Sequence, residues 1–366
     1  TDKASTHLTI GKRLLAHLST EETLLFDIVA QFNRCYLLIT EAQERLQIAC
    51  LYLKAAQKAK QATAYAAGLD HLYGCRNWID IEALWQTNYP LAFTLHKELA
   101  EMEYLNGQMD TSQAIIADMQ PRLQSNLDQV DMYHLLIIQK TLQGHYQEAI
   151  NLGHQALQLL DSGLTLDNPS EFTQKIVADL KQKLPQPISS LLNAPLVVEL
   201  EKQAIFKILG TIQSTCYQVE LELFSAATFM LINLALTYGH VPESCLSYAT
   251  YGLLLCARFE EYTLGYQFGQ LALHLAEKLQ SPTQRGKSSM VMLGYIYPWS
   301  KTIQQLPTLF RTAYEISLAC GDLEFAGYSA IHIVTMLFYH CSNLHKTQRI
   351  KLLSIPFNLY KGCQLT

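Results

Sequence analysis

Apolar residues recur at helical spacing along almost the whole chain. Residues 46–69 illustrate the pattern with two successive stripes, first Leu46, Ala49, Leu53 and Ala56, then Ala64, Ala67 and Leu69. A spacing of three or four residues places such side chains on one face of an α-helix. No convincing run of alternating β-branched residues interrupts the pattern, so the sequence predicts an all-α fold.

Glycines mark where the predicted helices end. Gly107, Gly144 and Gly321 each follow a long apolar-periodic segment, and a second such segment begins within a few residues. Glycine in this position supplies the left-handed conformation that ends a helix. Each glycine therefore predicts two helices joined by a tight turn. The separation of Gly107 and Gly144 is close to the roughly 34 residues of a tetratricopeptide repeat.

Helix starts also have local signals. Residues 19–22 (STEE) and 40–43 (TEAQ) both fit a capping box, in which a Ser or Thr side chain caps the first turn. Asn168 precedes Pro169, a residue suited to the first helical position. We therefore expect helices to begin at these three places.

Small side chains form a file within residues 264–279, LGYQFGQLALHLAEKL, at Gly265, Gly269, Ala272 and Ala276. Because glycine inside a helix costs roughly 1 kcal/mol relative to alanine, a helix that keeps two glycines needs a packing reason. Residues 144–157 align with residues 260–273 and repeat this spacing. We predict that the file lets helix backbones approach closely, and we assign this structural packing role to Gly265, Gly269, Ala272, Ala276, Gly144, Ala149 and Gly153.

The repeat pattern fades between residues 161 and 199, a segment with four of the chain's 11 prolines and a polar helix in its middle. This change predicts a connector. The expected organisation is an N-terminal helical-repeat lobe over residues 1–160, a connector over 161–195 and a C-terminal helical-repeat lobe over 196–366.

Composition narrows the class of protein. The chain has 366 residues, of which 49% are hydrophobic and 16% charged, so it can bury a large core. Its net charge is -5 and its basic residues are scattered, which argues against nucleic acid as a partner. We expect no membrane insertion, because no apolar stretch approaches the roughly 20 residues of a membrane span. Without a signal-peptide pattern in the first 20 residues, a cytoplasmic location is expected.

Catalytic and metal chemistry have weak candidates. His340, Cys341 and His345 form the densest ligand-like cluster, but the spacing fits no standard zinc module and a fourth ligand is missing. His240 and Cys245 could pair as base and nucleophile, yet no third orienting group accompanies them. Packing is the favoured role for both groups. No catalytic residue, metal or cofactor is expected, and the chain is not expected to be an enzyme.

Aromatic residues are better candidates for binding a protein partner. Pro298 interrupts a helix within LGYIYPWSKT, where Tyr295, Tyr297 and Trp299 could present an aromatic surface. The alternative is that these rings fill the space between adjacent hairpins. The first helices of tetratricopeptide hairpins line a concave face. Candidates for that groove are Tyr133, His134, Tyr248 and Tyr251.

Several stretches together resemble the tetratricopeptide-like helical region of very large bacterial signalling proteins. They are residues 51–72 (LYLKAAQKAKQATAYAAGLDHL), 91–114 (LAFTLHKELAEMEYLNGQMDTSQA), 251–279 (YGLLLCARFEEYTLGYQFGQLALHLAEKL) and 321–338 (GDLEFAGYSAIHIVTMLF), with NPSEF of the connector at 168–172. In that family a Ser/Thr kinase domain and a STAND-type ATPase precede the helical region, and a GAF domain and sensor histidine kinase often follow it. None of the family's catalytic motifs is present here, and Glu260 and Glu261 replace its usual glycine before the tyrosine that matches Tyr262.

The resemblance implies a regulatory arm. The favoured function is a non-enzymatic protein–protein interaction module that regulates or scaffolds a partner of unknown identity in bacterial signalling. One alternative is a stand-alone adaptor or effector that modulates a separate enzyme or a host protein, inside the host cell in the latter case. The other is a small-molecule sensor arm with a pocket between the lobes.

Overall fold

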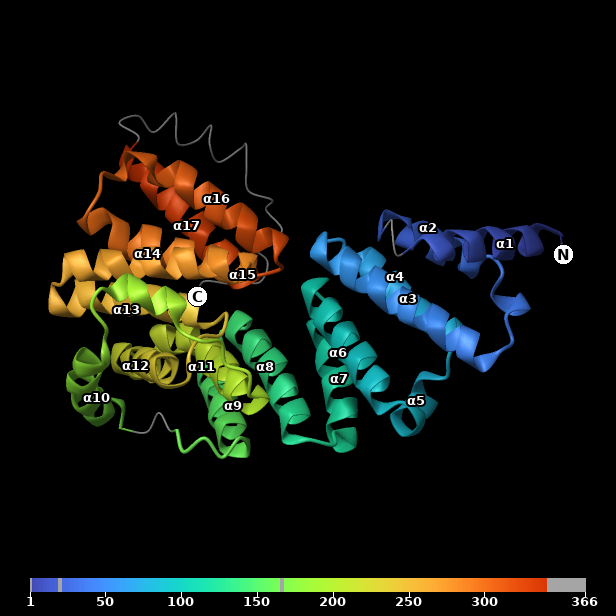
Figure 1. Ribbon diagram of the computed structural model, residues 1–366, viewed down its shortest axis with the longest axis horizontal. Coiled ribbons are helices and arrows are strands. Elements are labelled where there is room, and N and C mark those ends of the chain that lie inside the picture. Colours follow the sequence, from blue (N-terminus) through green and yellow to red (C-terminus); the bar gives the residue numbers. More distant parts are fainter. Residues whose placement is uncertain (1, 19–21, 165–167, 341–366) are drawn as a thin grey trace. The chain divides into compact units, whose positions relative to one another are not determined.

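The computed structural model describes residues 2–18, 22–164 and 168–340 (Figure 1). The described residues form helices joined by turns and irregular connections, and the β-structure among them is one isolated parallel bridge between Leu196 and His240. The all-α prediction is therefore confirmed.

The chain divides into two compact units, residues 1–124 and residues 125–366. Residues 125–160, which the sequence assigns to the N-terminal lobe, pack within the second unit against the helix that begins at Leu200. The boundary between the compact units therefore does not coincide with the connector predicted at 161–195. That connector does contain the expected polar helix, Pro169–Lys183.

The described part of the first unit contains seven α-helices. They are α1 (Asp2–His17), α2 (Leu25–Asn33), α3 (Ala42–Gln61), α4 (Tyr65–Gly74), α5 (Ile81–Thr87), α6 (Tyr89–Leu105) and α7 (Met109–Met119). Short 3-10 segments lie at Glu22–Leu24, Tyr36–Leu38, Cys75–Asn77 and Gln120–Arg122. Consecutive helices pack in pairs, α3 with α4 and α6 with α7, as the glycine and stripe patterns predict.

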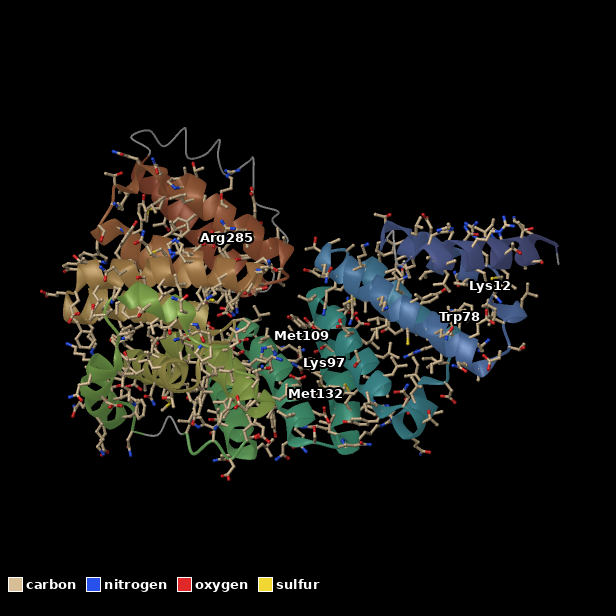
Figure 2. The ribbon with its side chains drawn as sticks, in the orientation of Figure 1. Lys12, Trp78, Lys97, Met109, Met132 and Arg285 are labelled. Atoms are coloured by element: carbon tan, nitrogen blue, oxygen red, sulfur yellow. The ribbon has the colours of Figure 1, made fainter. Side chains whose placement is uncertain are left out.

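Trp78 is the largest fully buried side chain of the first unit, and Figure 2 shows it beside α3. Its ring packs against Phe32 and Tyr52. Arg45 fixes the backbone around it, because the guanidinium donates to the carbonyl oxygens of Ile39, Asn77 and Trp78 at 2.9, 2.5 and 2.8 Å. The charge of Arg45 thus stabilises two connections between helices.

The described part of the second unit contains ten α-helices. They are α8 (Asn126–Leu142), α9 (Tyr146–Leu159), α10 (Pro169–Lys183), α11 (Leu200–Val219), α12 (Leu221–Tyr238), α13 (Ser244–Phe259), α14 (Tyr262–Lys278), α15 (Pro282–Val291), α16 (Leu306–Ala319) and α17 (Leu323–His340). A π-helical turn, η6 (Met292–Ile296), and 3-10 segments η5 (Ile188–Asn193), η7 (Tyr297–Trp299) and η8 (Ile303–Gln305) complete it. Pairs again dominate: α8 with α9, α11 with α12, α13 with α14, and α16 with α17.

The glycine file of α14 lies against neighbouring helices. A Cβ added to Gly265 would lie 2.7 Å from the carbonyl oxygen of Gly252 on α13, and one added to Gly269 would overlap the sulfur of Met292. On α9, a Cβ at Gly153 would lie 2.7 Å from Cγ2 of Ile212. The remaining members of the predicted set on α9 and α14 are buried, namely Ala149, Ala272 and Ala276.

Gly144 has a different role from the one assigned to it. Its φ is +77° and a Cβ added there would meet no atom within 4 Å, so it ends α8 rather than packing against another helix. Gly107 and Gly321 also have positive φ, at +86° and +72°. All three glycines therefore mark helix ends, as their positions in the sequence predict.

The predicted helix starts are partly confirmed. Pro169 begins α10, but Asn168 has a φ of +52° and its side chain makes no capping hydrogen bond. Helix α3 begins at Ala42 with Glu41 rather than Thr40 as its cap, because the Glu41 carboxylate accepts from the Glu44 N–H at 2.7 Å. The third signal, at 19–22, falls largely outside the described residues.

Helix α12 contradicts the expectation that every apolar stretch is too short for a membrane. With 18 residues and a mean hydropathy of 1.4, it is long and apolar enough to span one. In this fold 61% of the stretch is buried against other helices of the second unit. A buried core helix has the same length and composition, so α12 is weak support for a membrane location.

Candidate interaction surfaces

The aromatic segment after α15 leaves regular helix as predicted. Residues Met292–Ile296 form the π-helical turn and Tyr297–Trp299 the 3-10 segment around Pro298. Trp299 is 57% exposed, and its ring stacks on Tyr262 with centroids 4.9 Å apart. Tyr297 is half-buried against the core. Of the three predicted aromatic residues of this segment, Trp299 therefore offers the most surface to a partner.

Tyr295 lies at the meeting point of three elements. Its half-buried ring contacts Tyr217 of α11 and His332 of α17, with centroids 6.3 and 5.5 Å away. Burial raises the pKa of the Tyr295 hydroxyl, so this group stays protonated at neutral pH. The structure thus brings together rings from residues more than a hundred positions apart in the sequence.

A hydrogen bond joins α11 to α17 beside these rings, and exposed apolar residues neighbour the rings in the sequence. Gln218 Nε2 donates to Tyr328 Oη at 3.0 Å and so connects α11 to α17. Exposed aliphatic side chains lie beside these tyrosines in the sequence, at the α11–α12 turn and one helical turn after Tyr328. We name the combined set, Tyr217, Val219, Leu221, Tyr295, Tyr328 and Ile331, the α11–α17 surface.

Two of the predicted groove residues are not on a surface. Tyr248 and Tyr251 of α13 are only 0% and 3% exposed, so they do not line an open groove. The Tyr248 hydroxyl lies 2.9 Å from Nε2 of His240, and the Tyr251 ring packs edge-on against Phe268. Burial raises the pKa of Tyr251 to about 12. Both side chains are buried because α13 is surrounded by other helices along most of its length.

The other two groove candidates lie on α8. Tyr133 is half-buried and packs against the core of the second unit, and His134 is half-buried as well. Their rings therefore offer a partner less surface than Trp299 does. Within the described chain, Tyr133 makes no ring contact with Tyr295, Tyr297 or Trp299.

A cluster of charged residues that the sequence analysis missed joins α15 to α17. Lys287 Nζ lies 3.2 Å from Asp322 Oδ2, and Tyr328 Oη donates to Glu324 Oε1 at 3.1 Å. Burial raises the pKa of Glu324. Burial also lowers the pKa of Lys287, but Asp322 and Glu324 raise it by more, so Lys287 remains charged. No local signal identifies the cluster, since its members meet only once the helices pack.

The pairing of His240 with Cys245, which the sequence made a weak candidate, does not form. The Nε2 atom of His240 faces Tyr248, and burial lowers the pKa of His240 to about 4. Cys245 is fully buried and its pKa is raised to about 12, so its thiol is a poor nucleophile. Cys341 and His345 lie outside the described residues, as does the side chain of His340. Among the residues that are described, no group of three potential ligands could hold a metal ion.

The first unit carries a groove that the sequence did not indicate. A cavity of about 600 Å³ is lined in part by Arg76, Asp80, Glu82 and His96, and an adjoining one of about 310 Å³ shares three of these residues and adds apolar side chains from α4, α6 and α7. Glu82 pairs with Arg122 at 2.6 Å. Arg76 has no carboxylate partner in the described chain, and its guanidinium lies over Tyr73. The groove could hold a ligand with one carboxylate and an apolar body.

Comparison with characterised proteins finds a signalling relative. The chain is 22% identical over 341 residues to "Hybrid signal transduction histidine kinase G" of Dictyostelium discoideum. The match covers 85% of this chain and 10% of that protein, so the chain spans about a tenth of the length of its relative. No model of a known protein family matches the chain.

Proposed function

We propose that this chain is a non-catalytic interaction arm: a tetratricopeptide-like array of helical hairpins that binds a protein and regulates or scaffolds a signalling enzyme. The observation that carries the proposal is the match to a histidine kinase over 85% of this chain but 10% of the relative. A helical segment that matches only a tenth of a histidine kinase is better explained as an accessory region than as the complete catalytic part.

The packing of the helices supports the repeat architecture. Successive pairs stack on one another, with α9 on α11, α12 on α13 and α14 on α15. In such arrays each hairpin buries its apolar face against its neighbours, and the outer faces remain available for partners. In the α11–α17 surface Tyr217 is 44% exposed, and tyrosine is a residue type that often acts as an interface anchor. The aliphatic members of the surface are exposed as well.

The proposal is tested by affinity capture with the whole chain as bait from a lysate of the source organism. The matched variants are Leu221→Asp with Ile331→Asp, on the α11–α17 surface, and Leu37→Asp, at an exposed position of the first unit. We expect one stoichiometric signalling protein to bind the parent and Leu37→Asp and to be lost from the double variant. Equal capture by all three baits would refute a role for this surface, and capture of no signalling protein would refute the proposed function.

A small-molecule sensor is the second candidate, and the groove at Arg76 favours it. The groove lies within the first unit rather than between two lobes. Mass spectrometry of the natively purified chain, compared with Arg76→Gln, would detect a co-purified carboxylate ligand that depends on this cation. If the purified chain carries no such ligand, a sensor that binds its metabolite tightly is excluded.

A further inference from the structure

The segment that leads into α11 makes one isolated parallel bridge, between Leu196 and His240. Val197 N–H donates to the carbonyl oxygen of His240 at 2.9 Å, and His240 N–H donates to that of Pro195 at 2.7 Å. Gln203 Nε2 donates to the carbonyl oxygen of Val197 at 2.8 Å. The backbone is extended at both ends of this segment, at Ala194 and Glu199. Residues 195–198 are therefore held extended, like a short strand, beside His240, which follows α12.

The other edge of this strand is unpaired. In an extended chain the N–H and C=O groups of successive residues point to alternate sides. Because Pro195 and Val197 face His240, Leu196 and Val198 face away from it. Within the described part of the chain, the N–H and C=O groups of Leu196 and Val198 have no hydrogen-bond partner. Four backbone groups are thus available along one edge.

Aliphatic side chains accompany that edge. Val197 is buried, whereas Leu196, Val198 and Leu200 are 58%, 77% and 64% exposed. An exposed edge with uncovered aliphatic side chains is a template for another strand, which proteins normally block with charge, proline or a covering element. Neither Leu196 nor Val198 provides such a block.

The charges beside the edge indicate which strand it would accept. Glu199 and Glu201 are exposed, and neither makes an ion pair in the described chain. The nearby cation Lys202 lies over the ring of Tyr238, 4.8 Å from its centroid. Two free carboxylates next to an aliphatic row complement a segment with both aliphatic and basic residues.

We infer that the edge formed by Leu196 and Val198 is a docking site for an extended segment of a partner protein, with aliphatic residues at alternate positions and Lys or Arg beside them. The inference rests on the proposed function, since it supplies a second and chemically defined surface for an interaction arm. The partner segment adds a strand: its backbone pairs with the four free groups, its aliphatic side chains cover Leu196, Val198 and Leu200, and its cations meet Glu199 and Glu201.

The test uses the whole chain and a fluorescent synthetic peptide, Lys-Thr-Val-Thr-Val-Thr-Lys-Lys. We expect saturable binding by fluorescence anisotropy, with amide shifts at Leu196 and Val198 in the NMR spectrum. N-methylation of the two peptide amides that face the edge removes about two hydrogen bonds to the protein. The Kd for this methylated peptide should therefore be about tenfold higher or more. Replacing its three Lys with Glu should also weaken binding, and added salt should then strengthen the residual binding, because salt screens the repulsion from Glu199 and Glu201.

The matched protein variants are Val198→Asp at the edge and Val334→Asp, an exposed valine of α17 that belongs to neither proposed surface. Val198→Asp should raise the Kd about tenfold, while Val334→Asp should leave it within about twofold of the parent. Absence of peptide binding, or equal binding by both variants, would overturn the inference. The inference would also be overturned if sedimentation equilibrium showed a dimer that Val198→Asp disrupts, because the edge would then bind a second copy of the chain. None of these outcomes depends on the capture experiment, which tests the α11–α17 surface.

Discussion

Gly252 of α13 and Gly265 of α14 bring two helix backbones into close contact. A Cβ at either residue would lie within 2.7 Å of the carbonyl oxygen of the other. Backbone cannot move aside as a side chain can, so this crossing tolerates less than the one at Gly269, where the Met292 side chain can shift. The spacing in the sequence identified Gly265 because its neighbours repeat at three and four residues. Gly252 lies in a second file of small residues with the same spacing, formed with Cys245, Ala249 and Cys256.

Gly265→Ala should therefore destabilise the protein, by roughly 1 to 3 kcal/mol, as overpacking of a close contact does. The control is Gly327→Ala on α17, where an added Cβ meets no atom within 4 Å. That change should be neutral or stabilising by up to about 1 kcal/mol, because alanine favours the helix. Urea unfolding followed by circular dichroism gives both values, and equal stability of the two variants would contradict the packing argument.

His240 should make the second unit sensitive to acid. Its pKa is about 4 in the folded protein and near 6.5 when unperturbed, so unfolding takes up about one proton between these values. The contribution of neutral His240 to the free energy of unfolding is therefore complete above pH 6.5, and it is lost as the pH falls toward 4. In His240→Gln the uptake of about one proton on unfolding should disappear, so the free energy of unfolding should depend less steeply on pH. The free energy of unfolding is measured as a function of pH. His274→Gln, at an exposed position, serves as the control. A His240→Gln slope identical to that of the parent would contradict the assignment.

For the helices, the sequence predicted where they end but did not predict which of their faces are buried. Glycines at 107, 144 and 321 end helices because the left-handed backbone they adopt is a local property. Which face of a helix is covered depends on neighbours far away in the sequence. Tyr248 and Tyr251 could still have been predicted as buried, because residues 244–256 contain no charged residue, and a helix that is apolar all round is a core helix. The cluster around Lys287 had no comparable signal.

Lys287 should hold α15 and α17 together through the carboxylates of Asp322 and Glu324. Lys287→Met leaves these acids close to each other without a cation, which should cost roughly 1 to 3 kcal/mol, less than for a fully buried pair. Glu324→Gln in the same chain should restore part of that loss by removing one negative charge. A double-mutant cycle from urea unfolding measures the coupling, and additive effects of the two changes would show that the groups do not interact.

The whole molecule should unfold in two steps. Each compact unit has its own buried core, with Trp78 in the first unit and the contact of Gly252 and Gly265 in the second. Trp78→Ala should lower the melting temperature of one transition, and Gly265→Ala should lower that of the other. Differential scanning calorimetry of the full chain separates these effects. A single transition that both variants shift would contradict independent cores.

The hydrogen bond between Gln218 and Tyr328 has a mechanical consequence. A stack of hairpins in which each hairpin contacts only its neighbours stretches like a spring, because small changes at each junction add up. In the second unit this bond connects residues 110 positions apart, so α11 and α17 cannot separate without breaking it. Together with the ring contacts of Tyr295 to Tyr217 and His332, this bond should resist small extensions of the region between α11 and α17. It should break before the helices unfold, because one exposed hydrogen bond contributes only about 1 kcal/mol.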